Sequence, residues 1–205
     1  PAKGAKSRGE ILAWLAGQRH SRLIDEEMGK LITTLEAGDH DDYFRANLKE
    51  MRRKYDEAVK LPTEFVSEFT KARSEALIAW QKARSESDFS QFAPHLQKLI
   101  DLTRQKIDYL GCEHTPYDVL LDEYEIGMTV EDYDPLFAGL KSRLVPLLSK
   151  IMQSDVVIPR LPEEMTFPAD AQEEFCNKVS KAMGFDFEAG RMDRSTHPFC
   201  AGLWP

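Results

Sequence analysis

The side chains most suited to metal-dependent hydrolysis in this sequence are its five histidines. A catalytic zinc site on a helix needs two histidines on one face, with a glutamate between them to activate water. The histidines are His20, His40, His95, His114 and His197. No two of them lie within four positions of each other, so neither HExxH nor HxxEH occurs. The sequence therefore predicts no metal ligands of this kind within the chain.

Two other clusters combine possible ligands, Cys112–Asp118 ("CEHTPYD") and Asp39–Tyr43 ("DHDDY"). Adjacent loop residues rarely converge on one ion, so a cluster at the start of a helix is favoured over a metal site for Cys112–Asp118. Carboxylates also stabilise the free N–H groups of a helix start. The same interpretation, helix capping rather than metal binding, is favoured for Asp39–Tyr43.

Candidates for acid–base or nucleophilic chemistry are few. Asp122, Glu123 and Glu125 could act as paired carboxylates, but solvation at a surface helix end is the favoured alternative. His197 and Cys200 could form a base and a nucleophile, yet the intervening Pro198 makes their hydrogen bonding unfavourable. No catalytic residue is predicted from these patterns.

Composition limits the possible partners. The formal net charge is −8, and acidic and basic residues are interspersed. This argues against nucleic-acid binding, which needs clustered lysine and arginine. No apolar run approaches the ~20 residues of a membrane span, and we do not expect the stretch "PAKGAKSRGE" to be a secretion signal, because no apolar core follows it. The three widely spaced cysteines form no CxxC pair, so we expect reduced thiols and a cytoplasmic location.

Apolar spacings of three and four residues predict helices through most of the chain. Ser7 and Glu10 form a possible capping box for the first helix, whose predicted buried face is Ile11, Leu12, Leu15 and Ala16. Later helices are expected at about 25–37, 41–59, 63–83, 89–110, 115–121, 129–151 and 169–183. Because only Pro62 and a short turn separate the helices at 41–59 and 63–83, they should pair as an antiparallel hairpin. Pro146 should kink the helix at 129–151.

After Gly184 the pattern changes to turns and short alternating segments in "FDFEAGRMDRSTHPF". No linker or repeat divides the chain. The sequence therefore predicts one all-α domain over residues 1–205, made of long antiparallel helices with a short strand-like segment at its C-terminal edge.

Two long stretches strongly resemble the carboxypeptidase Taq family of zinc metallocarboxypeptidases. They are "TPYDVLLDEYEIGMTVEDYDPLFAGLKSRLVPLL" (115–148) and "FPADAQEEFCNKVSKAMGFDFEAGRMDRSTHPFCAGLWP" (167–205). The start of the chain, "PAKGAKSRGEILAWLAGQRHSRLID", is similar to a region after the family's first helix. The resemblance covers essentially the whole chain in order.

The resemblance implies an all-α fold with two lobes around a groove, usually a homodimer, that removes amino acids from peptide C-termini. This chain would form one lobe. The family's HPF motif is matched by His197, Pro198 and Phe199, which are therefore the expected substrate-binding residues. Zinc is the family's cofactor, held by an HExxH helix and a downstream glutamate.

This chain departs from that pattern, since the zinc-binding half and the family's first helix have no counterpart in it. We therefore expect no zinc bound by this chain alone and no peptidase activity from it alone. Its expected roles are groove wall and dimer surface, with a second copy or a complementary C-terminal polypeptide as partner. The alternative is a non-catalytic helical module, derived from the family, that serves interaction or oligomerisation.

Overall fold

The computed structural model describes residues 4–157, 162 and 165–194, and every regular element in these ranges is helical. It divides into two units, residues 1–142 and 143–205. The all-α fold is confirmed. The described part of the predicted strand-like segment, residues 185–194, forms turns and irregular chain without a strand.

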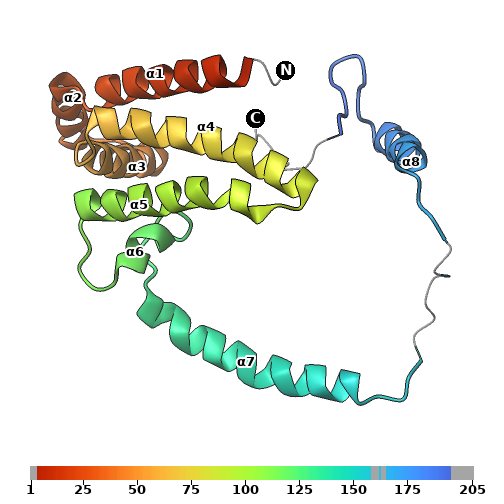
Figure 1. Ribbon diagram of the computed structural model, residues 1–205. Coiled ribbons are helices and arrows are strands. Elements are labelled where there is room, and N and C mark those ends of the chain that lie inside the picture. Colours follow the sequence, from red (N-terminus) through yellow and green to blue (C-terminus); the bar gives the residue numbers. More distant parts are fainter. Residues whose placement is uncertain (1–3, 158–161, 163–164, 195–205) are drawn as a thin grey trace. The chain divides into compact units, whose positions relative to one another are not determined.

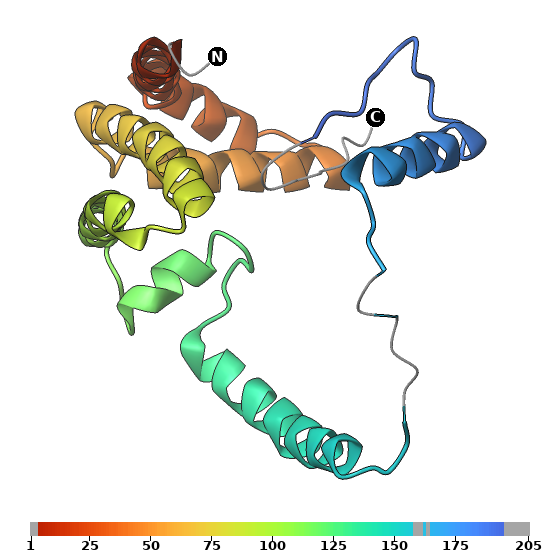
Figure 2. The same ribbon diagram turned by 45° about the vertical axis from the view of Figure 1, so that its right-hand side comes forward.

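Three helices of the first unit form an antiparallel layer: α1 (Ala5–Leu23), α4 (Thr63–Glu86) and α5 (Ala93–Leu110). Figures 1 and 2 show α4 between α1 and α5. Gly9 lies beside Ser74 and Gly17 beside Ser67, so α1 and α4 run in opposite directions. A short 3-10 turn, η2 (Phe89–Gln91), joins α4 to α5.

The predicted buried face of α1 is wrong. Ile11, Leu12 and Leu15 are exposed, whereas Gly9, Ala13 and Gly17 are buried against α4. Small residues allow two helix backbones to approach closely, and this close approach leaves the larger apolar side chains of α1 outside the contact. The predicted capping box is also wrong, because α1 begins at Ala5 with Gly4 as its N-cap.

Two shorter helices, α2 (Glu26–Glu36) and α3 (Asp42–Ala58), lie across the end of the layer where α1 ends and α4 begins (Figure 1). The Asp25 carboxylate caps α2 by accepting from the Glu27 N–H, and Asp41 caps α3 in the same way. The predicted hairpin of α3 with α4 is wrong, because α3 packs on α2 and α1. A short connection brings two helix ends together but does not set the angle between the helices.

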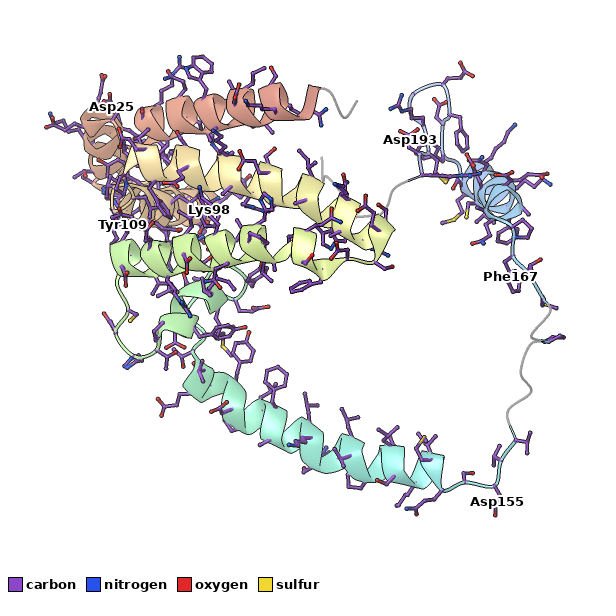
Figure 3. The ribbon with its side chains drawn as sticks, in the orientation of Figure 1. Asp25, Lys98, Tyr109, Asp155, Phe167 and Asp193 are labelled. Carbon is purple, nitrogen blue, oxygen red and sulfur yellow. The ribbon has the colours of Figure 1, made fainter. Side chains whose placement is uncertain are left out.

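The hydrophobic core of this unit joins α4 to α5. Phe65, Ala72 and Leu102 are buried together. Tyr109 of α5, which is labelled in Figure 3, packs its ring edge-on against Phe65, and the ring centroids are 5.1 Å apart. Lys98 of α5 and Glu68 of α4 add an ion pair at 3.2 Å on the surface.

The remaining helices are α6 (Pro116–Leu121), α7 (Val130–Met152) and α8 (Ala169–Ala182). α7 continues as one helix through Pro146. In the second unit, Arg194 forms ion pairs with Asp170 and Glu173, which fixes residue 194 against the start of α8. Gly184 follows α8 with φ of +90°, a conformation that favours glycine.

Candidate functional site

The corner between α6 and α7 lies within residues 115–148, the first of the two long stretches quoted above. The Asp118 carboxylate accepts hydrogen bonds from the Thr115 N–H at 3.2 Å and from the Val130 N–H at 2.8 Å. Thr115 is the N-cap of α6, and Val130 is the first residue of α7. A single carboxylate therefore satisfies free N–H groups at the starts of two helices.

The start of α7 has a second carboxylate of its own. Thr129 donates to Asp132 from its N–H at 2.9 Å and from its hydroxyl at 2.7 Å. The expected start of this helix at about residue 129 is confirmed. The Thr129 hydrogen bonds lower the pKa of Asp132, and the Val130 N–H is the main cause of the lowered pKa of Asp118.

The acidic run after α6 anchors the corner to two neighbouring helices. Asp122 accepts from the Gly127 N–H at 2.8 Å and lies 3.6 Å from Arg53 of α3. Glu123 forms an ion pair with Lys106 of α5. Both side chains form ion pairs and remain 43% exposed, which agrees with the expected solvation at a surface helix end.

Arg53 is the centre of the ion pairs at this corner. Besides Asp122, it contacts Glu50 at 2.8 Å and Glu57 at 3.8 Å. The hydrogen bond from Arg53 is the main cause that lowers the pKa of Glu50 to about 2. The same carboxylates raise the pKa of Arg53.

A cavity of 460 Å³ lies within this corner, and we call it the corner cavity. Its apolar lining comes from Leu110, Val119 and Met128. Its charged lining consists of Arg53, Lys60, Asp56, Glu57, Glu113, Asp118, Asp122 and Glu123. Several of these groups already bond to one another or to backbone, as described above. Ion pairs that hold helices together perturb pKa values just as catalytic sites do, so the shifted pKa values here do not by themselves indicate catalysis. Because the charged groups bond to one another and to backbone, they indicate a structural role.

Cys112 and His114 both line the corner cavity. Cys112 is an exposed free thiol. Within the part of the chain that the structure describes, no group of three His, Cys, Asp or Glu side chains is placed to bind a metal ion. The described residues therefore do not fit a zinc site. Asp41 acts as a helix cap, as the sequence predicted for its cluster.

The expected substrate-binding residues His197, Pro198 and Phe199 lie outside the described residues, as does Cys200. The structure instead draws attention to His20, which the sequence analysis did not single out. His20 is 7% exposed, and its Nε2 donates to the Ala58 carbonyl at 3.0 Å. Its Nδ1 shares a hydrogen bond of 2.9 Å with the Thr63 hydroxyl. The sequence signal for this residue is its place three positions after Gly17 and seven after Ala13, on the face of α1 that packs on α4.

Comparison with known proteins assigns the chain to a family. A sequence profile described as Carboxypeptidase Taq (M32) metallopeptidase matches residues 1–205. The chain belongs to this M32 family. It is 32% identical over 205 residues to carboxypeptidase 1 of Bacillus subtilis, covering 99% of this chain and 41% of that protein. The family resemblance seen in the sequence is thereby confirmed.

Solved structures of M32 enzymes share the fold of the chain. A crystal structure designated BsuCP superposes with a TM-score of 0.90 at 32% identity, covering 97% of this chain and 40% of that one. A carboxypeptidase from Pyrococcus furiosus superposes with a TM-score of 0.77, also at 32% identity, covering 97% and 41%. The chain thus spans about two fifths of the length of the relatives it matches.

Proposed function

We propose that this chain supplies part of the scaffold of a metal-dependent carboxypeptidase, an enzyme that releases amino acids from the C-termini of peptides. The observation that carries the proposal is the match of the whole chain to the M32 family, with a TM-score of 0.90 to BsuCP. In this proposal, residues 1–205 are a single helical domain that forms a groove wall and a dimer surface. His197, Pro198 and Phe199 contact the substrate.

The metal, zinc in this proposal, is bound by residues that this chain does not contain. The sequence has no HExxH motif, and its described residues gather no metal-binding group. The chain alone is then inactive, and its partner is a second copy or a polypeptide with the complementary part of the fold. We place its function in the cytoplasm, without nucleic acid or membrane as partner. Within the described residues, no helix combines the length and apolar character needed to cross a bilayer.

The first test measures metal content and hydrolysis on the purified 205-residue chain. Elemental analysis reports bound zinc, and a blocked dipeptide reports release of its C-terminal amino acid. We expect neither stoichiometric metal nor release. Stoichiometric zinc together with chelator-sensitive release would overturn the proposed inactivity and direct attention to Cys112, His114 and His197.

The second test supplies the missing part. The chain is co-expressed with the segment of B. subtilis carboxypeptidase 1 that it does not match, and hydrolysis is measured on the purified complex. Restored, chelator-sensitive release that falls when His197 is replaced by alanine supports the proposal. A stable complex that remains inactive would favour the alternative, a non-catalytic helical module.

A further inference from the structure

A cavity of 380 Å³ lies on one face of the layer formed by α1, α4 and α5, and we call it the layer cavity. Its floor is one face of α4, because the lining residues of this helix are spaced by three and four: Lys71, Ser74, Glu75, Ile78 and Ala79. Lys6 and Gly9 of α1 line one side, and His95 of α5 lines the other. Three helices therefore contribute to one hollow.

The basic side chains of the layer cavity have no partner among the described residues. Neither Lys6 nor Lys71 forms a hydrogen bond or an ion pair with them, and the His95 ring forms none either. Elsewhere on the helices, Lys30 and Lys178 each pair with a glutamate four residues earlier, at 2.8 and 2.7 Å. The lysines of the layer cavity thus differ from these paired lysines of the surface.

The order of the charges along each helix explains why the two lysines are unpaired. Each is followed four residues later by a glutamate, Glu10 in α1 and Glu75 in α4. Lysine before glutamate is the less favourable order for such a pair, because it opposes the helix dipole. With Lys6 and Lys71 at +1 each and Glu75 at −1, the lining has a net charge of +1 while His95 is neutral. The layer cavity is therefore locally positive on a chain whose net charge is −8.

The starts of two helices add positive potential at the same end of the layer. Figure 1 shows that α1 and α5 both begin at the end where α4 finishes. Lys6 is the second residue of α1, and His95 is the third residue of α5. Neither helix has an acidic residue in its first turn or a side-chain cap. Since a helix start has free N–H groups and a partial positive charge, both starts favour an anion beside them.

The floor of the layer cavity combines a hydroxyl group with apolar surface. A Cβ added to Gly9 would lie 3.1 Å from the Ser74 Oγ, so the glycine leaves space beside this hydroxyl. The hydroxyl has no hydrogen-bond partner among the described residues and can donate to a ligand oxygen. Ile78, which is 41% exposed, and Ala79 supply the apolar part. A matching ligand would have an anionic head group and a short apolar body.

We propose that the layer cavity binds a small organic anion, with Lys6, Lys71 and His95 around its head group and Ile78 against its apolar body. The head group is a phosphate or a carboxylate, because a lysine ammonium group binds either as a point charge. The volume of 380 Å³ is within the range of about 300–1,000 Å³ that small-molecule sites occupy. This proposal goes beyond the proposed function and does not depend on it.

The test is isothermal titration calorimetry of the purified 205-residue chain at constant ionic strength. Two matched pairs of probes are used: n-butyl phosphate with inorganic phosphate, and butyrate with acetate. We expect one probe with an apolar body to bind one site per chain, at least about threefold more tightly than its matched partner, because burying apolar carbon adds affinity. The tighter of n-butyl phosphate and butyrate then assigns the head group. Absence of saturable binding by all four probes would overturn the proposal, and equal binding within each pair would overturn the apolar contact.

A pair of double variants tests the location of the site. Lys6→Gln with Lys71→Gln should weaken binding by at least about tenfold, since two charge-assisted contacts are removed. Lys141→Gln with Lys181→Gln is the matched control, because it changes the net charge equally at exposed positions outside the cavity, and it should weaken binding by less than about twofold. Circular dichroism verifies that the helices remain in both. Equal weakening by the two double variants would reduce the effect to net charge and overturn the site.

Nuclear magnetic resonance of the histidine rings gives a local readout on the wild-type chain. The bound probe should shift the Cε1 proton signal of His95, which is assigned by its loss in His95→Gln. The signal of His40, at the start of α3, should stay in place. A shift of the His40 signal with no shift of the His95 signal would place the anion elsewhere and overturn the proposal.

Discussion

Replacing His20 by alanine should loosen the junction of α1 with the start of α4. The substitution removes the hydrogen bonds to Ala58 and Thr63 and leaves a cavity where a buried ring stood. The Ala58 carbonyl keeps one partner, the Leu61 N–H at 3.0 Å, so it is not left entirely unsatisfied. Two hydrogen bonds at about 0.5–1.5 kcal/mol each, plus the cavity, give roughly 2–4 kcal/mol.

The assay is urea unfolding followed by circular dichroism, with Gln18→Ala on the exposed face of the same helix as control. We expect the control to change the free energy of unfolding by less than about 0.5 kcal/mol. A double-mutant cycle with Thr63→Val isolates the His20–Thr63 hydrogen bond, and its coupling should be about 0.5–1.5 kcal/mol. If Thr63→Val is equally destabilising in the wild type and in the His20→Ala variant, the reasoning fails.

Three further outcomes are expected. Gly29→Ala should lower the free energy of unfolding in urea by about 1–3 kcal/mol, since a Cβ there would overlap the Tyr55 hydroxyl of α3. Gly139→Ala should raise it by about 0.5–1 kcal/mol, because a Cβ there would meet nothing within 4 Å. Because the folded pKa of Asp118 is lowered, its contribution is present above about pH 4 and is lost as pH falls through the folded value. Asp118→Asn should therefore lower the melting temperature at pH 6. Between pH 6 and pH 3 the melting temperature of this variant should fall less than that of the wild type, whereas Asp134→Asn should follow the wild type. Arg53→Met should increase hydrogen exchange at the α6–α7 corner, and 1 M salt should reduce the difference from wild type.

The helices and several of their caps were predictable because they depend on local chemistry. Asp25 and Asp41 accept from N–H groups two or three residues ahead, so the sequence contains both partners of each bond within one turn. The stripes of α4 and α5 were predictable for a similar reason, since Phe65 and Leu102 repeat at helical spacing beside other apolar residues.

The pairing of the helices was not predictable in the same way. The α1–α4 contact depends on the absence of side-chain bulk at Gly9 and Gly17, and hydrophobic periodicity gives such positions little weight. The α6–α7 corner also depends on contacts distant in sequence. Asp118 bonds a residue twelve positions ahead, and Asp122 pairs with Arg53 across almost seventy residues. The sequence shows that Asp118 and Asp122 are acidic, but it does not show which residues they bond.

The antiparallel contact of α1 with α4 has a consequence for synthesis on the ribosome. α1 ends at Leu23, while its partner is complete only at Glu86, so 63 residues must be added between these points. At about 5–20 residues per second, α1 waits roughly 3–13 s before α4 can cover its glycine face. During that interval Gly9, Ala13 and Gly17 have no intramolecular partner from α4, and a chaperone at the exit tunnel would meet this helix first. Slower translation of the segment between α2 and α4 would lengthen the time for which α1 is exposed. Codon usage in that segment is thereby linked to the yield of folded chain.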